Sequence, residues 1–186
     1  MAFAIHTSGS GESDAESSEE ANLKKIVFTG FAAILLLGAF VVAQQSRSTH
    51  IYDDTNVTMA MVSQAMESAK SQHKFLMVEF GANWCGDCVA LARNLELSPT
   101  REYVRDHFII LKVNVGQFDR NLDVAKALGV DLNRGIPTAV FFAPDGNKIG
   151  ATNNGELEPA SKYGSRQIYG FLRQIAERGT ITDPGK

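Results

Sequence analysis

One feature of the sequence constrains the fold more than any other: a predicted strand is followed by a short turn and then by a predicted helix. Both cysteines of the chain lie in that turn. Residues 75–80 (FLMVEF) form an almost continuous apolar run, which predicts a buried strand. Residues 89–95 (VALARNL) predict a helix. The CGDC motif at 85–88 lies between them, and such a motif at a strand-to-helix junction indicates thiol–disulfide exchange. The junction places Cys85 at a helix N-terminus, where the helix dipole favours the thiolate.

Two other uses of a cysteine pair compete with redox exchange: a static disulfide and half of a zinc site. A structural zinc ion takes four ligands. The remaining candidates, none of which has ligand spacing to the motif, are His6, His50, His73 and His107. A static disulfide across so short a loop would add little stability, because the entropic effect grows with loop length. We therefore expect redox exchange through the two thiols themselves, with no metal and no cofactor.

The charge balance argues against one class of partner. The 186 residues carry a formal net charge of −3 at pH 7, so no basic field favours nucleic acid. Residues 1–22 are rich in Ser, Glu and Gly and have little to bury. We expect residues 1–25 to form a disordered cytoplasmic tail, residues 44–56 a polar linker, and residues 57–180 a folded domain.

An apolar segment separates the predicted tail from the predicted domain. Residues 26–43 (IVFTGFAAILLLGAFVVA) contain no charged side chain, and a helix of this length spans about 27 Å, close to the thickness of a bilayer core. Lys24 and Lys25 directly before it predict a cytoplasmic N-terminus and an exported C-terminal part. The run exceeds the ~7–15 apolar residues of a typical signal peptide, so we favour a single-pass anchor in the inner membrane with the domain in the periplasm. The alternative is a signal peptide cleaved near Ala43, which would leave a soluble periplasmic protein.

The order of predicted elements in the exported part indicates an α/β fold with a central mixed sheet flanked by helices. Thr55 or Asn56 is the expected cap of a first helix that begins near Val57. Ser98 and Pro99 predict the cap and the first residue of a short helix after the motif. The other expected elements are strands at 108–115, 138–143 and 148–152, a helix at 121–128 with Leu122, Ala125 and Leu128 on one face, and a final helix at 165–178. Parallel crossovers come first in this order, and an antiparallel hairpin follows.

This element order, with Trp84 directly before the CGDC motif, resembles the thioredoxin fold. A second motif agrees with the first: residues 135–138 (GIPT) precede the next-to-last strand, where the family has its cis-proline segment. The match covers residues 57–178, and residues 114–123 resemble exported or membrane-anchored bacterial members of the superfamily more than cytosolic thioredoxin. The chain departs from thioredoxin in its Gly86-Asp87 dipeptide, in extra length at 131–134 and 153–162, and in its N-terminal apolar segment.

The resemblance implies roles for four side chains. Cys85 would be the nucleophile that attacks a substrate disulfide, and Cys88, one turn on, would resolve the mixed disulfide. Glu79 matches a buried family carboxylate that exchanges a proton with the resolving cysteine. Burial would raise the pKa of Glu79 and suit it to acid–base work near neutral pH, whereas at a strand edge it would simply reach solvent. Lys112 matches a family lysine near that carboxylate, and it either holds Glu79 ionised or extends to water.

The remaining expected site residues flank the cysteines. Pro137 is expected to follow a cis peptide bond. Ile136 and Thr138 would then present backbone groups beside Cys85, with which an extended substrate can pair. Trp84 is either a lid over the thiols or part of the core.

Asp87, between the two cysteines, gives the only indication of redox direction. A carboxylate there opposes a neighbouring thiolate and raises its pKa, so the reduced form is stabilised less and the couple becomes more reducing. We therefore expect a reductant of disulfides in exported proteins, supplied with electrons by a membrane thiol reductant carrier. A disulfide oxidase or isomerase of the same fold remains open, as does a non-catalytic binding or chaperone module.

Overall fold

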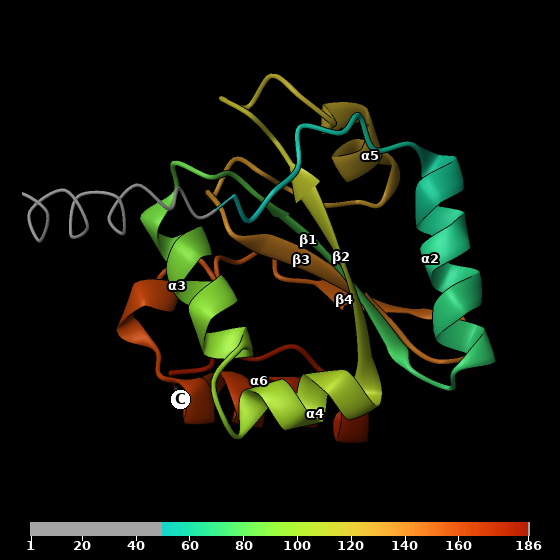
Figure 1. Ribbon diagram of the computed structural model, residues 1–186, viewed down its shortest axis with the longest axis vertical. Helices are drawn as coiled ribbons and strands as arrows, with labels where there is room; N and C mark the ends of the chain where they lie inside the picture. Colours follow the sequence, from blue (N-terminus) through green and yellow to red (C-terminus); the bar gives the residue numbers. More distant parts are fainter. Residues whose placement is uncertain (1–49, 186) are drawn as a thin grey trace, which may run out of the picture. The chain divides into compact units, whose positions relative to one another are not determined.

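A mixed four-stranded sheet organises the part of the chain that the computed structural model describes, residues 50–185 (Figure 1). The strands are β1 (Phe75–Gly81), β2 (Phe108–Asn114), β3 (Thr138–Phe142) and β4 (Lys148–Ala151), in the order β2-β1-β3-β4. β1 pairs with β2 in parallel, whereas β3 runs antiparallel to both β1 and β4. The α/β class and the mixed sheet agree with the sequence, but within this sheet only the β1–β2 pair is parallel, so the expected run of parallel crossovers is reduced to one.

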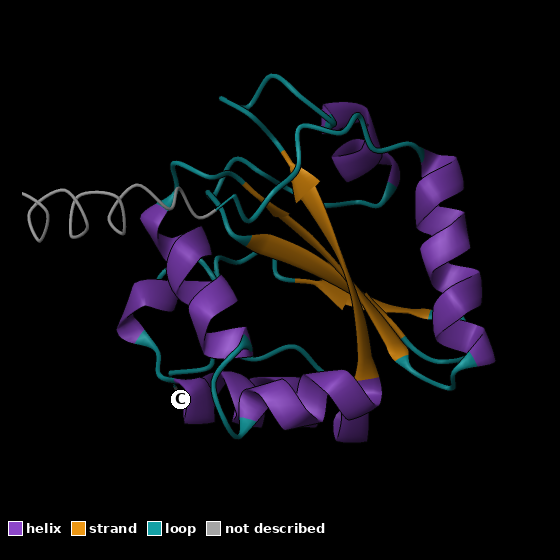
Figure 2. Ribbon diagram, viewed as in Figure 1, coloured by secondary structure: helices purple, strands orange, loops and turns teal. Residues whose placement is uncertain are grey.

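Helices cover both faces of the sheet (Figure 2). One face carries α2 (Met59–Ser71) and α5 (Leu122–Ala127), and the other carries α3 (Gly86–Leu95), α4 (Thr100–His107) and α6 (Ser165–Arg178). A short 3-10 helix, η1 (Ala160–Lys162), contacts α3 and lies within the extra length noted at 153–162. α6 has the bounds that the sequence predicts, and Gly179 ends it.

β1 supplies side chains to two separate cores, because successive residues of a strand point to opposite faces. Leu76 and Val78 belong to the core under α2 and α5. Met77 belongs to the core under α3, α4 and α6. Glu79 follows Met77 by two residues, so it points to the α3 face of the sheet, and none of its surface is exposed.

The N-terminal end of the described chain is part of the fold, although the sequence predicts a linker at 44–56. Tyr52 has no exposed surface and packs in the core. The compact unit that contains the sheet already includes residues 50–56. The domain therefore begins earlier than residue 57, because one aromatic side chain anchors a segment that is otherwise polar.

The expected start of the first helix is also wrong by a few residues. Thr58, not Thr55 or Asn56, caps α2, and its side chain accepts a hydrogen bond from the Met61 backbone N–H. The reason lies at residue 57, which is buried and donates its backbone N–H to Asn121 Oδ1 at 2.9 Å. That contact holds the chain in an extended path before the helix begins.

The expected cap at Ser98 is wrong, because the Ser98–Pro99 peptide bond is cis and α4 begins at Thr100. A contact between two helix starts accompanies this change. Thr100 Oγ1 donates a hydrogen bond to the Ser165 carbonyl oxygen at 2.6 Å. Ser165 Oγ in turn donates to the Leu97 carbonyl oxygen at 2.8 Å, so the start of α6 fixes this end of α4.

The apolar face expected for the helix at 121–128 is only partly correct. Ala125 and Leu128 are buried, but Leu122 is exposed, and Val124 takes its place in the core. The helix has only six residues, and Asn121 before it has a left-handed backbone conformation with φ of 54°. This local twist turns the first residue of α5 toward solvent.

The tail predicted at 1–25 and the apolar segment at 26–43 lie outside the described residues. Within residues 50–185, no helix is both long and apolar enough to cross a membrane. The described chain thus starts in the second half of the predicted linker.

Candidate active site

The two cysteines form a disulfide at the start of α3. Cys85 is the N-cap of this helix, and its Sγ accepts a hydrogen bond from the Cys88 backbone N–H at 3.1 Å. Cys85 is 6% exposed, whereas Cys88 is completely buried. Gly86 between them faces solvent. The more accessible sulfur therefore lies at the positive end of the helix dipole, with the second sulfur behind it.

The segment before β3 lies against the first cysteine. The Ile136–Pro137 peptide bond is cis, as the sequence motif implies. The Ile136 carbonyl oxygen is 3.5 Å from Cys85 Sγ, although 51 positions separate the two residues. Thr138 Oγ1 donates to the Gly135 carbonyl oxygen at 2.7 Å and closes the turn that leads into β3. The fold thus brings the two sequence motifs into one site.

Trp84 lies at the surface beside the motif, and its side chain is 52% exposed. The indole Nε1 donates a hydrogen bond to the Gly116 carbonyl oxygen at 2.7 Å. The ring of Phe118, which is also exposed, meets the indole edge-on with 6.0 Å between ring centres. Of the two options for Trp84, this position excludes core packing.

Glu79 has two ionisable neighbours on the α3 face of the sheet. The Tyr52 hydroxyl donates a hydrogen bond to Glu79 Oε1. Lys112, the register partner of Glu79 on β2, places its Nζ 3.9 Å from Glu79 Oε2. The same Nζ lies 5.4 Å from the centre of the Tyr52 ring, and the lysine side chain is 29% exposed. Lys112 therefore faces Glu79 and also reaches water, so both of its expected contacts are present.

Burial raises the pKa of Glu79 above its ordinary value, although the charge of Lys112 and the hydrogen bond from Tyr52 act in the opposite direction. Burial also raises the pKa of Tyr52, and the Glu79 carboxylate adds to that effect. The Tyr52 hydroxyl consequently keeps its proton at neutral pH and remains a donor. A buried carboxyl with a raised pKa has the properties of a group that takes up and releases a proton near neutrality.

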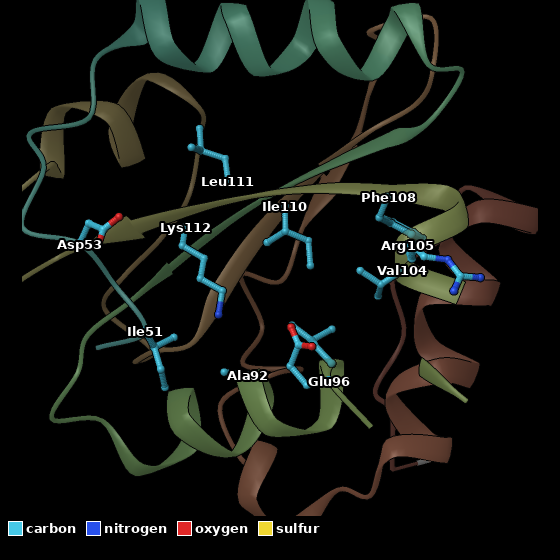
Figure 3. Close-up of a pocket in the computed structure, with 11 residues that line it drawn as sticks. Ile51, Asp53, Ala92, Glu96, Val104, Arg105, Phe108, Ile110, Leu111 and Lys112 are labelled. Carbon is cyan, nitrogen blue, oxygen red and sulfur yellow. The ribbon is translucent and has the colours of Figure 1, made fainter. Parts of the chain in front are cut away.

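A groove of about 480 Å³ exposes this side of the site to solvent (Figure 3). It opens between α3, α4 and β2 and includes the chain segment at 51–53. Lys112 points from β2 toward α3 in this view, whereas its neighbour Leu111 points to the opposite face of the strand. Lys112 therefore meets solvent at the wall of this groove, whereas Glu79 lies buried behind it.

Asp87 contacts the extra segment that carries η1. Its Oδ1 accepts a hydrogen bond from the Ser161 backbone N–H at 2.8 Å, across 74 positions of sequence. The carboxylate between the cysteines thus ties the first turn of α3 to η1, a structural contact that the sequence does not reveal. Within residues 50–185, no group of three or more His, Cys, Asp or Glu side chains is placed to hold a metal ion.

Comparison with known proteins places this site in a family. A sequence profile described as "Thioredoxin-like" matches residues 57–144. A crystal structure described as a disulphide isomerase from Xylella fastidiosa Temecula1 superposes with a TM-score of 0.63 and 37% sequence identity, over 67% of this chain and 95% of that one. The chain belongs to the thioredoxin-like superfamily.

Curated thioredoxin-like relatives match a smaller part of the chain. The chloroplastic thioredoxin-like protein CITRX of Arabidopsis thaliana is 33% identical over 103 residues, which are 55% of this chain and 52% of that protein. Protein disulfide isomerase-like 2-2 of Oryza sativa subsp. japonica is 33% identical over 113 residues, which are 60% of this chain and 26% of that protein. The match thus spans about half of the CITRX chain and a quarter of the disulfide isomerase.

The thioredoxin-like fold brings most of the residues singled out by sequence into one region. The disulfide lies against the cis-proline segment, and Glu79 with Lys112 lies on the sheet face that α3 covers. Asp87 is adjacent, but its carboxylate is engaged by η1.

Sequence reasoning missed Tyr52, which contacts the carboxylate directly. The residue lies in a polar stretch, His50-Ile-Tyr-Asp-Asp54, that has neither strand nor helix periodicity. One signal was present: an Ile-Tyr pair in a segment otherwise rich in polar residues needs an apolar contact elsewhere.

Proposed function

We propose that this protein is a thiol–disulfide oxidoreductase that reduces disulfides of exported proteins through Cys85 and Cys88. The observation that supports it most is the disulfide at the N-terminus of α3, with the more accessible sulfur 3.5 Å from the carbonyl oxygen before the cis-proline. A helix N-terminus stabilises the thiolate that attacks, and a neighbouring backbone carbonyl offers an edge for an extended peptide.

The proposed reaction starts from the dithiol form. The Cys85 thiolate attacks one sulfur of a substrate disulfide, forms a mixed disulfide and releases the other substrate sulfur as a thiolate. The Cys88 thiol then gives its proton to Glu79, and the Cys88 thiolate attacks Cys85 Sγ. The second substrate thiolate leaves, one substrate thiolate takes up the proton from Glu79 and the other takes up a proton from water, so the substrate disulfide becomes two thiols and the protein becomes the disulfide seen in the structure.

The direction of the reaction is proposed on electrostatic grounds. Asp87 places a negative charge in the first turn of α3, beside the position of the Cys85 thiolate. This charge disfavours the reduced form and makes the couple more reducing. A disulfide isomerase is the second candidate, since the Xylella structure that is 37% identical carries that description.

The location and the electron supply belong to the same proposal. Residues 26–43 would anchor the chain in the inner membrane with the domain in the periplasm, or would be removed near Ala43. A dithiol in that compartment needs an electron donor on the same side of the membrane. A membrane thiol reductant carrier of this kind would regenerate the Cys85–Cys88 dithiol after each turnover.

Reduction of insulin by the full chain, with dithiothreitol as the electron source, tests the activity. We expect Cys85→Ser to lower turnover to the uncatalysed rate, because no thiolate is left to attack. Cys88→Ala is the matched variant, and we expect it to accumulate a mixed disulfide that mass spectrometry detects on Cys85. Turnover that survives Cys85→Ser would contradict the proposed function.

A further inference from the structure

The contact between Tyr52 and Glu79 has a support of its own, outside the two sequence motifs. Asn83 Oδ1 accepts hydrogen bonds from the backbone N–H groups of Ile51 and Tyr52 at 2.9 and 3.0 Å. Asn83 Nδ2 donates to the Tyr52 carbonyl oxygen at 2.8 Å. One amide side chain, two positions before Cys85, therefore holds the main chain of Tyr52 on both sides.

Gly81 provides the space that the tyrosine ring occupies. It lies two residues after Glu79 on β1, so both positions face α3. A Cβ atom at residue 81 would overlap the hydroxyl end of the Tyr52 ring. Any larger residue there would displace the hydroxyl from the carboxylate. Asn83 thus fixes the main chain of Tyr52 and Gly81 leaves room for its ring, although neither takes part in the reaction proposed above.

The two oxygens of Glu79 consequently have different surroundings. Oε1 accepts the hydrogen bond from Tyr52. Among the described residues, Oε2 accepts no hydrogen bond, and its nearest charge is Lys112 Nζ at 3.9 Å. A buried carboxylate oxygen without a hydrogen-bond partner is unfavourable for folding, so its position calls for an explanation.

We propose that Tyr52 is a positioning residue for the proton transfer that the proposed function assigns to Glu79. Its hydroxyl fixes Oε1 and turns the carboxylate so that Oε2 is the oxygen that accepts the proton of the Cys88 thiol. When Cys88 loses that proton, its sulfur attacks Cys85 Sγ in the mixed disulfide and the substrate thiolate leaves. Tyr52 itself exchanges no proton in this step.

The ionisable groups around Glu79 come from several elements. Tyr52 approaches from the N-terminal segment and Lys112 from β2, and Ala139, the partner on β3, carries no charge. The groove at Lys112 is also lined by three charged side chains, from the N-terminal segment, the C-cap of α3, and α4, namely Asp53, Glu96 and Arg105. Among residues 50–185, only the tyrosine donates a hydrogen bond to the Glu79 carboxylate, so replacing Tyr52 tests that one contact.

The test measures how fast a mixed disulfide on Cys85 is resolved, as a function of pH, in the full chain and in Tyr52→Phe. The ring remains in this variant, but the donor to the ionised carboxylate is lost. We expect resolution to be about tenfold slower at pH 7 and its pH profile to move to higher pH, because Glu79 then ionises less readily. The rate of the first attack by Cys85 should not change.

Two matched variants separate positioning from a general structural effect. In Glu79→Gln, the further change Tyr52→Phe should have no added effect, since the two residues act on one step. Tyr103→Phe, which removes a hydroxyl on α4, should leave the pH profile unchanged. The inference would be wrong if Tyr52→Phe slowed resolution of the mixed disulfide equally in the parent and in Glu79→Gln. It would also be wrong if Tyr52→Phe left the pH profile of resolution unchanged.

A second measurement keeps this inference separate from the proposed function. The Glu79 carboxyl can be titrated by carbon NMR in the oxidised protein, where no turnover is needed. Its titration should move to higher pH in Tyr52→Phe and, more weakly, in Asn83→Ala, which loosens the hold on the tyrosine. Failure to resolve any mixed disulfide would contradict the proposed function, whereas an unmoved titration would contradict the role of Tyr52.

Discussion

At the scale of single residues, Glu79 shows how one buried charge links stability to chemistry. Its carboxyl is enclosed on a sheet face, and burial outweighs the opposing influence of Lys112 and Tyr52 on its pKa. A charge in such a place is unfavourable for folding, and the position is consistent with the proton transfer that we propose for Glu79.

The raised pKa predicts the pH dependence of stability. The folded protein binds the Glu79 proton more tightly than the unfolded chain does, so this contribution to stability is complete below the unfolded pKa. It is lost as the pH rises through the folded pKa. Glu79→Gln has no carboxyl to ionise, so it does not lose stability as the pH rises. We expect the free energy of unfolding of this variant at pH 8 to exceed that of the parent by about 1 kcal/mol or more.

Urea unfolding of the oxidised proteins at several pH values measures this difference, since oxidised cysteines do not titrate. Glu67→Gln is the control, because Glu67 is an exposed carboxylate on α2. The two curves for Glu79→Gln and the parent should converge near pH 4. If Glu79→Gln were less stable than the parent at pH 8, the prediction that the buried Glu79 charge destabilises the fold would be wrong.

At the scale of elements, the strand–turn–helix at 75–95 was predictable because its signals are local. An almost continuous apolar run defines β1, and the motif and α3 follow after a short turn. Tyr52 was not predictable in this way. Its burial depends on Asn83 and Gly81, about thirty residues later in the chain, and no pattern around residue 52 contains that information.

The helix starts that sequence misplaced have the same explanation. Ser98-Pro99 satisfies the local rule for a cap and a first helical residue. The structure instead starts α4 at Thr100, whose hydroxyl contacts the first residue of α6. The contact between Thr100 and Ser165, 65 positions apart, therefore outweighs the weak local preference for a helix start at Pro99. Such a contact cannot be inferred from sequence periodicity.

The link between α3 and η1 gives a prediction for these two elements. Asp87 Oδ1 accepts the Ser161 backbone N–H at 2.8 Å in a solvent-exposed position, where such a bond stabilises by about 0.5–1.5 kcal/mol. We expect Asp87→Ala to speed hydrogen exchange of the Ser161 amide by about two- to tenfold. Asp87→Asn keeps an acceptor oxygen and should protect the amide nearly as well as the parent. Unchanged exchange in Asp87→Ala would show that η1 is held by its other contacts alone.

At the scale of the whole molecule, the redox state of one disulfide is linked to the stability of the entire fold. Oxidation and unfolding form a thermodynamic cycle, so a couple that is more reducing in the folded protein than in the unfolded chain makes the oxidised form the more stable one. If the protein is a reductant, as proposed, its oxidised form should be more stable to unfolding than its reduced form. This difference can be measured without any substrate.

We expect the oxidised full chain to unfold at a higher urea concentration than the reduced chain, with a difference in free energy of at least about 1.4 kcal/mol, equivalent to about 30 mV. Cys85 and Cys88 are only three positions apart, so chain entropy contributes little and the difference reports on the folded site. A protein with both cysteines replaced by serine should unfold identically with and without reductant. The standard potentials of the folded protein and of the urea-unfolded chain, both measured against glutathione, give the same difference by an independent route. If the reduced form were the more stable one and the potential were about −120 mV, the protein would be an oxidant. Asp87 would then serve mainly to hold η1.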